Sequence, residues 1–179
     1  MSKKVDVLQN SGFVVYYLLM EKSKIYLETT MFSFYYAPDV PGYTELKAQV
    51  WQIFDQIRAG KYEAYTSIYA VQEIEAETNL EKRDKMKRLV IDYGVVVLPE
   101  NEDSKRLAGL YIAEKAVPSA YTTDAAHIAI TAANGLDFIV SLNFEHIARP
   151  WTVEKVRKVN IREGFDGIGI YRPVEVLDL

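Results

Sequence analysis

The sequence predicts one α/β domain over residues 1–179, folded as a three-layer α/β/α sandwich around a central parallel sheet. Short apolar segments alternate along the chain with longer amphipathic ones, the order expected when helices connect parallel strands. The short segments are apolar at consecutive positions, which indicates strands covered on both faces. No internal repeat, low-complexity run or linker divides the chain, and its length fits one domain with a sizeable core.

The strands are expected at four places. Residues 95–98 give the clearest signal, because a β-branched run ends directly at Pro99. Residues 24–28 are a short apolar segment that closes with an acid, and the two prolines and the glycine of residues 36–42 predict a loop after it. In order along the chain, we expect strands over residues 24–28, 62–67, 95–98 and 137–142.

The helices are bounded by capping and stop signals. Thr44 can cap the first helix, glycines such as Gly60 and Gly135 end helices, and Pro118 ends another. In order along the chain, we expect helices over residues 44–59, 68–78, 80–93, 101–117, 122–135 and 153–163, followed by a closing segment at residues 174–176.

Composition excludes several kinds of site. The chain has no cysteine, which rules out zinc ribbons, disulfide frameworks, thiol nucleophiles and cysteine-bound iron–sulfur clusters. Its net charge of -4 gives no overall basic field for nucleic acid, so a nucleic-acid function has to rest on a local site. A cluster of carboxylates would itself contribute part of that negative charge.

The first twenty residues raise the question of export. Residues 13–20 are apolar and follow Lys3 and Lys4, which is the outline of a signal peptide. The segment is shorter than the roughly 18 apolar residues of a membrane span, and charged residues follow it without a small-residue cleavage site. We therefore expect a cytoplasmic protein with no membrane segment. Residues 1–20 are then an extra element, or an extension upstream of a natural start at Met20.

Four oxygen-bearing side chains are expected at one edge of the sheet. Ligands of open α/β sheets bind beyond the carboxyl ends of the strands. Glu28 closes the first strand and Asn143 follows the last predicted one. Glu73 lies on the helix after the second strand, and Asp124 begins the helix that leads into the last one. Carboxylate and amide oxygens suit Mg²⁺ or Mn²⁺, which can orient a phosphodiester and activate water without an amino-acid nucleophile.

Each of these residues also has a simpler interpretation. Glu28 could be a solvated acid at a strand end, and Asn143 could only form a turn. Asp124 in a first helical turn could act through the helix dipole alone. Glu73 shares a helix face with Glu77, a spacing typical of a solvated surface. The prediction therefore depends on the set of four and on no single member.

Two histidines leave a mixed histidine–carboxylate metal site as an alternative. His127 follows Asp124 by three residues, and His146 follows Asn143 by three. His127 lies in a helix rich in alanine and isoleucine, so we expect it to make one hydrogen bond in the core instead. His146 could hold the loop of Asn143.

Basic residues gather in two places. In residues 81–88, oppositely charged side chains stand four apart, as on a solvated helix. The group near the carboxyl end has fewer acidic residues among its basic ones, and it is the better candidate for RNA phosphate contacts. Its members are Arg149, Lys155, Arg157, Lys158 and Arg162.

Three segments resemble the signature blocks of the PIN (PilT N-terminus) domain family, and together they cover most of residues 24–150. Residues 25–35 resemble the first block, in which a strand ends in an acid followed by Thr or Ser. Residues 66–74 resemble the second, in which a helical Glu precedes Ile or Val. Residues 124–147 resemble the third and longest block, which is the most specific of the three.

The resemblance implies an α/β/α sandwich whose acidic pocket binds Mg²⁺ or Mn²⁺ and hydrolyses RNA as an endoribonuclease. Many members are toxins of toxin–antitoxin pairs, usually homodimers that a partner protein inhibits. The implied catalytic and metal-binding residues are Glu28, Glu73, Asp124 and Asn143, with Thr30, Ser67 and Ser141 in support.

Two positions depart from the family pattern. Glu28 stands where Asp is usual, and Asn143 stands where the last block often has a second Asp. A neutral fourth ligand weakens a second metal position. A catalytically silent PIN-like module that binds RNA or protein therefore remains the alternative. A response-regulator-like protein would need an acidic pair at the first strand and a late lysine, and neither is present.

Overall fold

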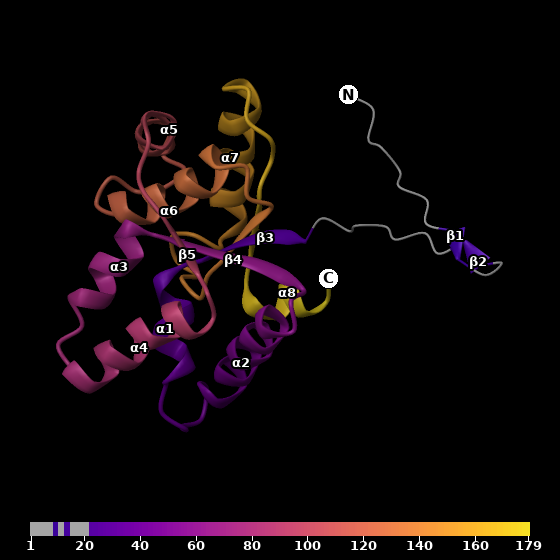
Figure 1. Ribbon diagram of the computed structural model, residues 1–179. Coiled ribbons are helices and arrows are strands. Elements are labelled where there is room, and N and C mark those ends of the chain that lie inside the picture. Colours follow the sequence, from indigo (N-terminus) through magenta and orange to yellow (C-terminus); the bar gives the residue numbers. More distant parts are fainter. Residues whose placement is uncertain (1–8, 11–12, 15–21) are drawn as a thin grey trace.

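Five parallel strands form the central sheet of the computed structural model, which describes residues 9–10, 13–14 and 22–179 (Figure 1). The strand order is β5-β4-β3-β6-β7, with β3 in the middle. The strands are β3 (Ser23–Leu27), β4 (Tyr62–Ser67), β5 (Val96–Leu98), β6 (Phe138–Val140) and β7 (Gly169–Tyr171).

Helices cover both faces of this sheet (Figure 1). One face carries α1 (Thr29–Tyr35), α2 (Thr44–Arg58), α4 (Leu80–Asp92) and α8 (Pro173–Leu177). The other carries α5 (Glu102–Ala113), α6 (Thr122–Ala133) and α7 (Pro150–Arg162). The short α3 (Ile68–Glu75) follows β4 directly and contacts both α4 and α6.

Side-chain alternation along the strands separates two hydrophobic cores. In β3, Ile25 and Leu27 belong to the core under α1, α2 and α4, whereas Tyr26 belongs to the core under α5, α6 and α7. All three side chains are fully buried. The predicted three-layer α/β/α sandwich with a parallel sheet is therefore confirmed.

The element predictions fail mainly in three places. Helix α1 was not predicted, and the tail contains β7 and α8 where only a closing segment was expected. Helix α5 ends at Ala113, short of the predicted residue 117, because Lys115 adopts a positive φ of 56° and turns Ala116 and Val117 into the core.

Strand β5 is also not covered on both faces. It lies at the edge of the sheet, and Val96 and Val97 are 49% and 40% exposed.

The amino-terminal residues are described only in part. Gln9–Asn10 and Phe13–Val14 pair as the short antiparallel strands β1 and β2, and most of the predicted extension lies outside the described residues. Across the described part of the chain, no helix has the length and apolarity that crossing a membrane requires.

The register of the sheet brings three strand ends together. Tyr26 of β3 is paired with Tyr65 of β4, and Leu27 is paired with Val140 of β6. Because these strands are parallel, the residues that follow them meet at the same carboxyl edge. Glu28 bonds across this edge through its backbone N–H to the carbonyl of Val140, 3.2 Å away.

Candidate metal centre

Glu28 is the most deeply placed acid of the carboxyl edge. It ends β3, caps α1 and is only 4% exposed. Its Oε2 accepts hydrogen bonds from the Thr30 backbone N–H at 3.1 Å, from the Thr30 hydroxyl and from the Ser141 hydroxyl at 2.8 Å. The Thr30 hydroxyl in turn accepts from the Leu142 N–H at 2.9 Å, so this acid joins the start of α1 to the loop after β6.

Glu73 approaches the same edge from α3. Its side chain is 39% exposed. Its Oε2 accepts from the Thr29 hydroxyl and faces the Nε2 of His127 at 3.1 Å. Thr29 is the first residue of α1 and His127 lies in α6, so the position of Glu73 is set by two other helices.

Asp124 lies in the first turn of α6 and is held by the loop that follows β6. Its Oδ1 accepts from the side-chain amide of Asn143 at 3.2 Å. Its Oδ2 is buried and has no hydrogen-bond partner among the described residues. A buried carboxylate oxygen without a donor is costly, so this atom is a natural position for a bound cation.

Asn143 is used within its own loop. Its Oδ1 accepts from the His146 backbone N–H at 3.1 Å, and its amide nitrogen donates to Asp124. The Ser141 hydroxyl accepts from the Asn143 N–H at 2.9 Å. In this arrangement Asn143 orients Asp124, and the metal-ligand role predicted for it stays a prediction.

The three acids share one pattern. In each, a single oxygen receives the hydrogen bonds, and these atoms are Oε2 of Glu28, Oε2 of Glu73 and Oδ1 of Asp124. The second oxygen of each acid accepts no hydrogen bond from a described side chain or backbone group. Glu28, Glu73 and His127 each offer a ligand atom within 4.8 Å of the others, a group that could hold a metal ion. The donor set is rich in oxygen and fits a hard divalent cation.

Electrostatics at the edge agree with a cation site. Burial raises the pKa of Glu28, and it raises the pKa of Asp124 although nearby histidines act in the opposite direction. Burial also acts to raise the pKa of Glu73, but the hydrogen bonds from His127 and Thr29 outweigh it and lower that pKa. A divalent cation would stabilise the ionised form of all three acids.

The other predicted residues have varied surroundings. Thr30 and Ser141 donate to Glu28, whereas the Ser67 hydroxyl accepts from the buried Tyr26 hydroxyl at 2.6 Å. Sequence reasoning did not identify Thr29 or Tyr26 as part of the site, although both lie within the first predicted block. It expected one core hydrogen bond for the side chain of His127, which is instead in contact with both Tyr26 and Glu73.

The basic residues predicted to contact RNA are engaged locally. Arg149 donates to the carbonyl of Glu145, and Lys155 donates to the carbonyl of Glu114 at 2.7 Å. Arg157 and Lys158 both pair with Glu154 and lie two turns or more along α7. Their predicted role in RNA binding stays a prediction, and Arg149, which precedes α7, stands nearest to the loop of Asn143 in sequence.

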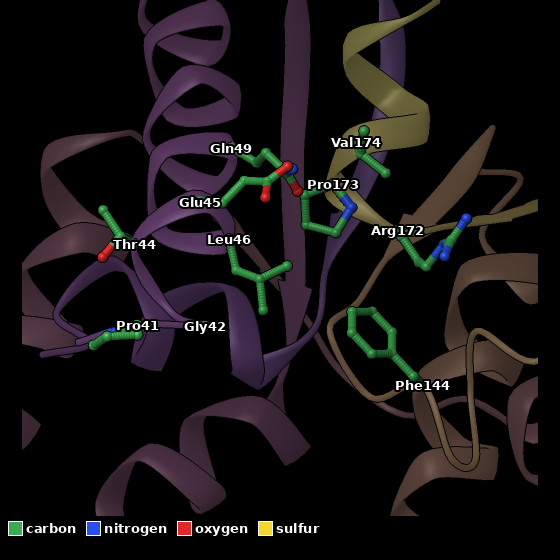
Figure 2. A pocket seen from close by; sticks show the side chains of 10 residues that line it. All are labelled: Pro41, Gly42, Thr44, Glu45, Leu46, Gln49, Phe144, Arg172, Pro173 and Val174. Carbon is green, nitrogen blue, oxygen red and sulfur yellow. The ribbon is translucent and has the colours of Figure 1, made fainter. Parts of the chain in front are cut away.

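A hollow of about 510 Å³ lies beside this loop and is distinct from the acids. Figure 2 shows Leu46 of α2 and Phe144, the residue after Asn143, on opposite sides of it. Pro173 at the start of α8 also lines the hollow. None of the three carboxylates contributes to its lining.

Comparison with known proteins bears on the fold. No family model matches the sequence, and no curated protein matches it. Among solved structures, the chain is similar to one in a structure described as VapBC2 from Rickettsia felis bound to a DNA fragment from their promoter. The TM-score is 0.52 at 9% identity, over 83% of this chain and 98% of that chain. At this identity the likeness shows a shared fold alone, in agreement with the three-layer α/β/α sandwich expected from the sequence.

Proposed function

We propose that this protein is a metal-dependent endoribonuclease that hydrolyses RNA phosphodiester bonds. One observation carries the proposal: Glu28, Glu73 and His127 offer ligand atoms within 4.8 Å of one another at the carboxyl edge of the sheet. Asp124 lies outside this group, but its charge interacts with Glu73 and His127, and its second oxygen is buried without a partner among the described residues.

The chain's own residues would prepare this centre. Glu28, Glu73 and Asp124 would hold Mg²⁺ or Mn²⁺, and Asn143 would keep Asp124 in place. The ion would polarise the phosphodiester and supply a reactive water at neutral pH. Thr30 and Ser141 fix the Glu28 carboxylate by hydrogen bonds, so the site needs little rearrangement to accept a cation.

We propose a toxin role from the similar solved structure and the sequence blocks taken together. The similar solved structure is described as VapBC2 bound to a DNA fragment from their promoter, and the sequence blocks resemble a family in which toxins of toxin–antitoxin pairs are common. We infer a cytoplasmic homodimer that an antitoxin protein inhibits. Light scattering of the purified protein should give twice the chain mass, and co-expression of a neighbouring small open reading frame should suppress RNA cleavage.

The decisive experiment compares RNA cleavage by the wild type, Asp124→Asn and Asp166→Asn in Mn²⁺. Asp166 is an exposed acid that lines a separate hollow before β7, so its substitution is a matched control. Asp124→Asn should lower cleavage by more than the roughly 10–100-fold typical of losing a residue behind a metal ligand. Asp166→Asn should cleave like the wild type.

Two results would redirect the proposal. Equal cleavage by Asp124→Asn and the wild type would exclude Asp124 from catalysis. Metal binding without any cleavage by the wild type would favour the silent RNA- or protein-binding module. Asn143→Asp adds a carboxylate beside Asp124, and stronger Mn²⁺ binding by this variant would support a ligand position there.

A further inference from the structure

A stacked aromatic pair flanks Asp124. The rings of Tyr121 and His146 have centroids 3.6 Å apart and planes inclined by 25°. Tyr121 directly precedes α6, three residues before Asp124. His146 lies in the loop after β6, where its backbone N–H donates to Asn143, and the amide of Asn143 donates to Asp124. The pair therefore joins the two segments that hold this acid.

His146 is the inner ring of the pair and is fixed by its surroundings. Its side chain is 17% exposed, and its Nε2 lies 3.8 Å from the Glu145 carboxylate. The hydroxyl of the fully buried Thr152 lies 3.1 Å from the His146 carbonyl and 3.0 Å from the Ala116 carbonyl. Thr152 thus ties the loop after β6 to the segment that leads to Tyr121, and the imidazole forms a firm support for the tyrosine ring.

Tyr121 is the outer ring and is open to solvent. It is 43% exposed although His146 covers one of its faces. Trp151 nearby in the fold is more exposed, but the Lys155 ammonium lies 4.3 Å from the centroid of its ring and occupies one face. Among the described residues, no cation and no second ring lies against Tyr121 in this way. An open aromatic face is a surface on which any nucleobase can stack.

We propose that the Tyr121–His146 pair is a platform for one unpaired nucleobase of the RNA, next to the phosphodiester that is cleaved. This role rests on the proposed endoribonuclease function and adds the form of RNA that the site recognises. Bases of single-stranded loops and ends can be splayed out and stacked on aromatic side chains, whereas bases within a duplex are held in its stack. The platform therefore selects unpaired RNA.

The position and charge of the platform favour an RNA base over a protein side chain as its occupant. The platform adjoins Asp124, so an RNA strand whose phosphodiester reaches the acids must place a neighbouring nucleotide beside it. Arg149 is exposed, follows His146 by three residues and donates to the Glu145 carbonyl of the same loop. Positive charge beside exposed aromatic rings is the combination that binds single strands.

Cleavage of a single-stranded RNA, and of the same RNA with one abasic nucleotide, tests the platform on the intact protein. The abasic nucleotide is placed in turn at each position around the mapped cleavage site. At one position we expect kcat/KM of the wild type to fall by about 5–150-fold, the loss of one base–aromatic stack. Tyr121→Leu should lose a similar factor on the intact RNA, and little more on the RNA that is abasic at that position.

This coupling separates a direct contact from a general disturbance of α6. A direct contact can be lost only once, whereas an indirect effect of Tyr121→Leu would multiply with the loss from the missing base. Tyr121→Phe keeps the ring, and its kcat/KM should stay within several-fold of the wild type. Tyr43→Leu is the matched control and should cleave both RNAs like the wild type. Tyr43 is 44% exposed and precedes α2, and its ring packs edge-on against Phe34.

The possible results separate the platform from the proposed function. RNA cleavage that Tyr121→Leu leaves unchanged, or losses that multiply at every abasic position, would overturn the platform and leave the endoribonuclease standing. No cleavage by the wild type in Mn²⁺ would overturn the proposed function and the platform with it. If Tyr121→Leu does not fold, the wild type is cross-linked by ultraviolet light to the same RNA carrying 5-iodouridine around the cleavage site. A cross-link to Tyr121 or His146 is expected, and cross-links confined to other residues would overturn the platform.

Discussion

At the scale of single residues, Thr30 does two things with one hydroxyl. It donates to the buried Glu28 carboxylate and accepts from the backbone N–H of Leu142. The contact with Leu142 crosses from the start of α1 to the loop after β6, whereas the contact with Glu28 stays within the cap of α1. The hydroxyl therefore contributes to stability and to the shape of the acidic centre at the same time.

Two substitutions of Thr30 should separate the contribution of its hydroxyl to stability from the contribution of its size. Thr30→Val keeps the shape but leaves the Leu142 N–H without its acceptor, so we expect a loss of about 1–3 kcal/mol in the free energy of unfolding. Thr30→Ser keeps the hydroxyl and removes one methyl group, which should cost about 1 kcal/mol. Urea unfolding measures both. A smaller loss for the valine variant than for the serine variant would show that the hydroxyl contributes little.

Asp124 should make the metal-free protein less stable as the pH rises. Burial raises its pKa above the ordinary value of 3.8, so the folded state holds the proton more tightly than the unfolded state does. Stability is then lost from the unfolded pKa upward through the folded pKa. The side chain introduced by Asp124→Asn does not titrate. The melting temperature of this variant minus that of the wild type should therefore increase with pH between the unfolded and folded pKa values of Asp124, and stay constant at higher pH.

Melting curves in EDTA over a series of pH values check this. The comparison reports Asp124 and its interactions, because Glu28 and Glu73 are present in both proteins and the charge of Glu73 acts on Asp124 only in the wild type. If the difference in melting temperature between Asp124→Asn and the wild type decreased with rising pH, the folded protein would favour the ionised form of Asp124, the reverse of the expectation.

At the scale of elements, the closing strand β7 depends on a glycine. A Cβ at Gly169 would come within 2.4 Å of the Tyr171 ring and 2.9 Å of the Phe138 side chain. Gly169→Ala should therefore cost about 1–3 kcal/mol through overpacking. Gly109→Ala is the contrasting variant, since Gly109 lies within α5 with nothing within 4 Å of its added Cβ.

That control should behave in the opposite way. Alanine in a helix interior is better than glycine by about 0.5–1 kcal/mol, so Gly109→Ala should stabilise the protein. Thermal unfolding of the two variants beside the wild type is sufficient. Similar effects in both would mean that the close approach of Gly169 to Tyr171 and Phe138 has no energetic consequence.

The same glycine explains what the sequence could and could not predict. Long amphipathic helices and the β-branched or apolar strands were predictable because their periodicity is local. Strand β7 was missed because it has only three residues and begins with Gly169, which weakens its strand signal. Helix α1 was missed because its start depends on Glu28 acting as a cap, and that acid was interpreted as a ligand or as a solvated acid at a strand end.

The candidate site, like the fold, was predictable from the sequence only in part. Glu28, Glu73 and Asp124 could be proposed from the sequence because each follows or precedes a predictable element. The contacts of His127 with Tyr26 and Glu73 could not, because these partners are 101 and 54 residues away in sequence. Which atoms meet across that distance is decided by the packing of α6 on the sheet, and no local pattern reports it.

At the scale of the whole molecule, the acidic centre links cation binding to folding. The ends of β3 and β6 and three helices contribute residues to it, so a cation bound there would stabilise contacts across the sheet. A cation at about 100 times its dissociation constant should add about 2.7 kcal/mol to the stability of the folded state. Mg²⁺ and Mn²⁺ should therefore raise the melting temperature of the wild type, and Asp124→Asn should show a much smaller rise. An equal rise in both proteins would indicate binding elsewhere.

The central claim is that Glu28, Glu73 and Asp124 together hold a divalent cation, and anomalous diffraction from crystals soaked in Mn²⁺ tests it most directly. We predict an anomalous peak at the carboxyl edge of the sheet, within bonding distance of Oδ2 of Asp124 and of the untied oxygens of Glu28 and Glu73. The absence of a peak at these three acids, in crystals that leave the edge open to solvent and bind Mn²⁺ at other positions, would contradict the claim.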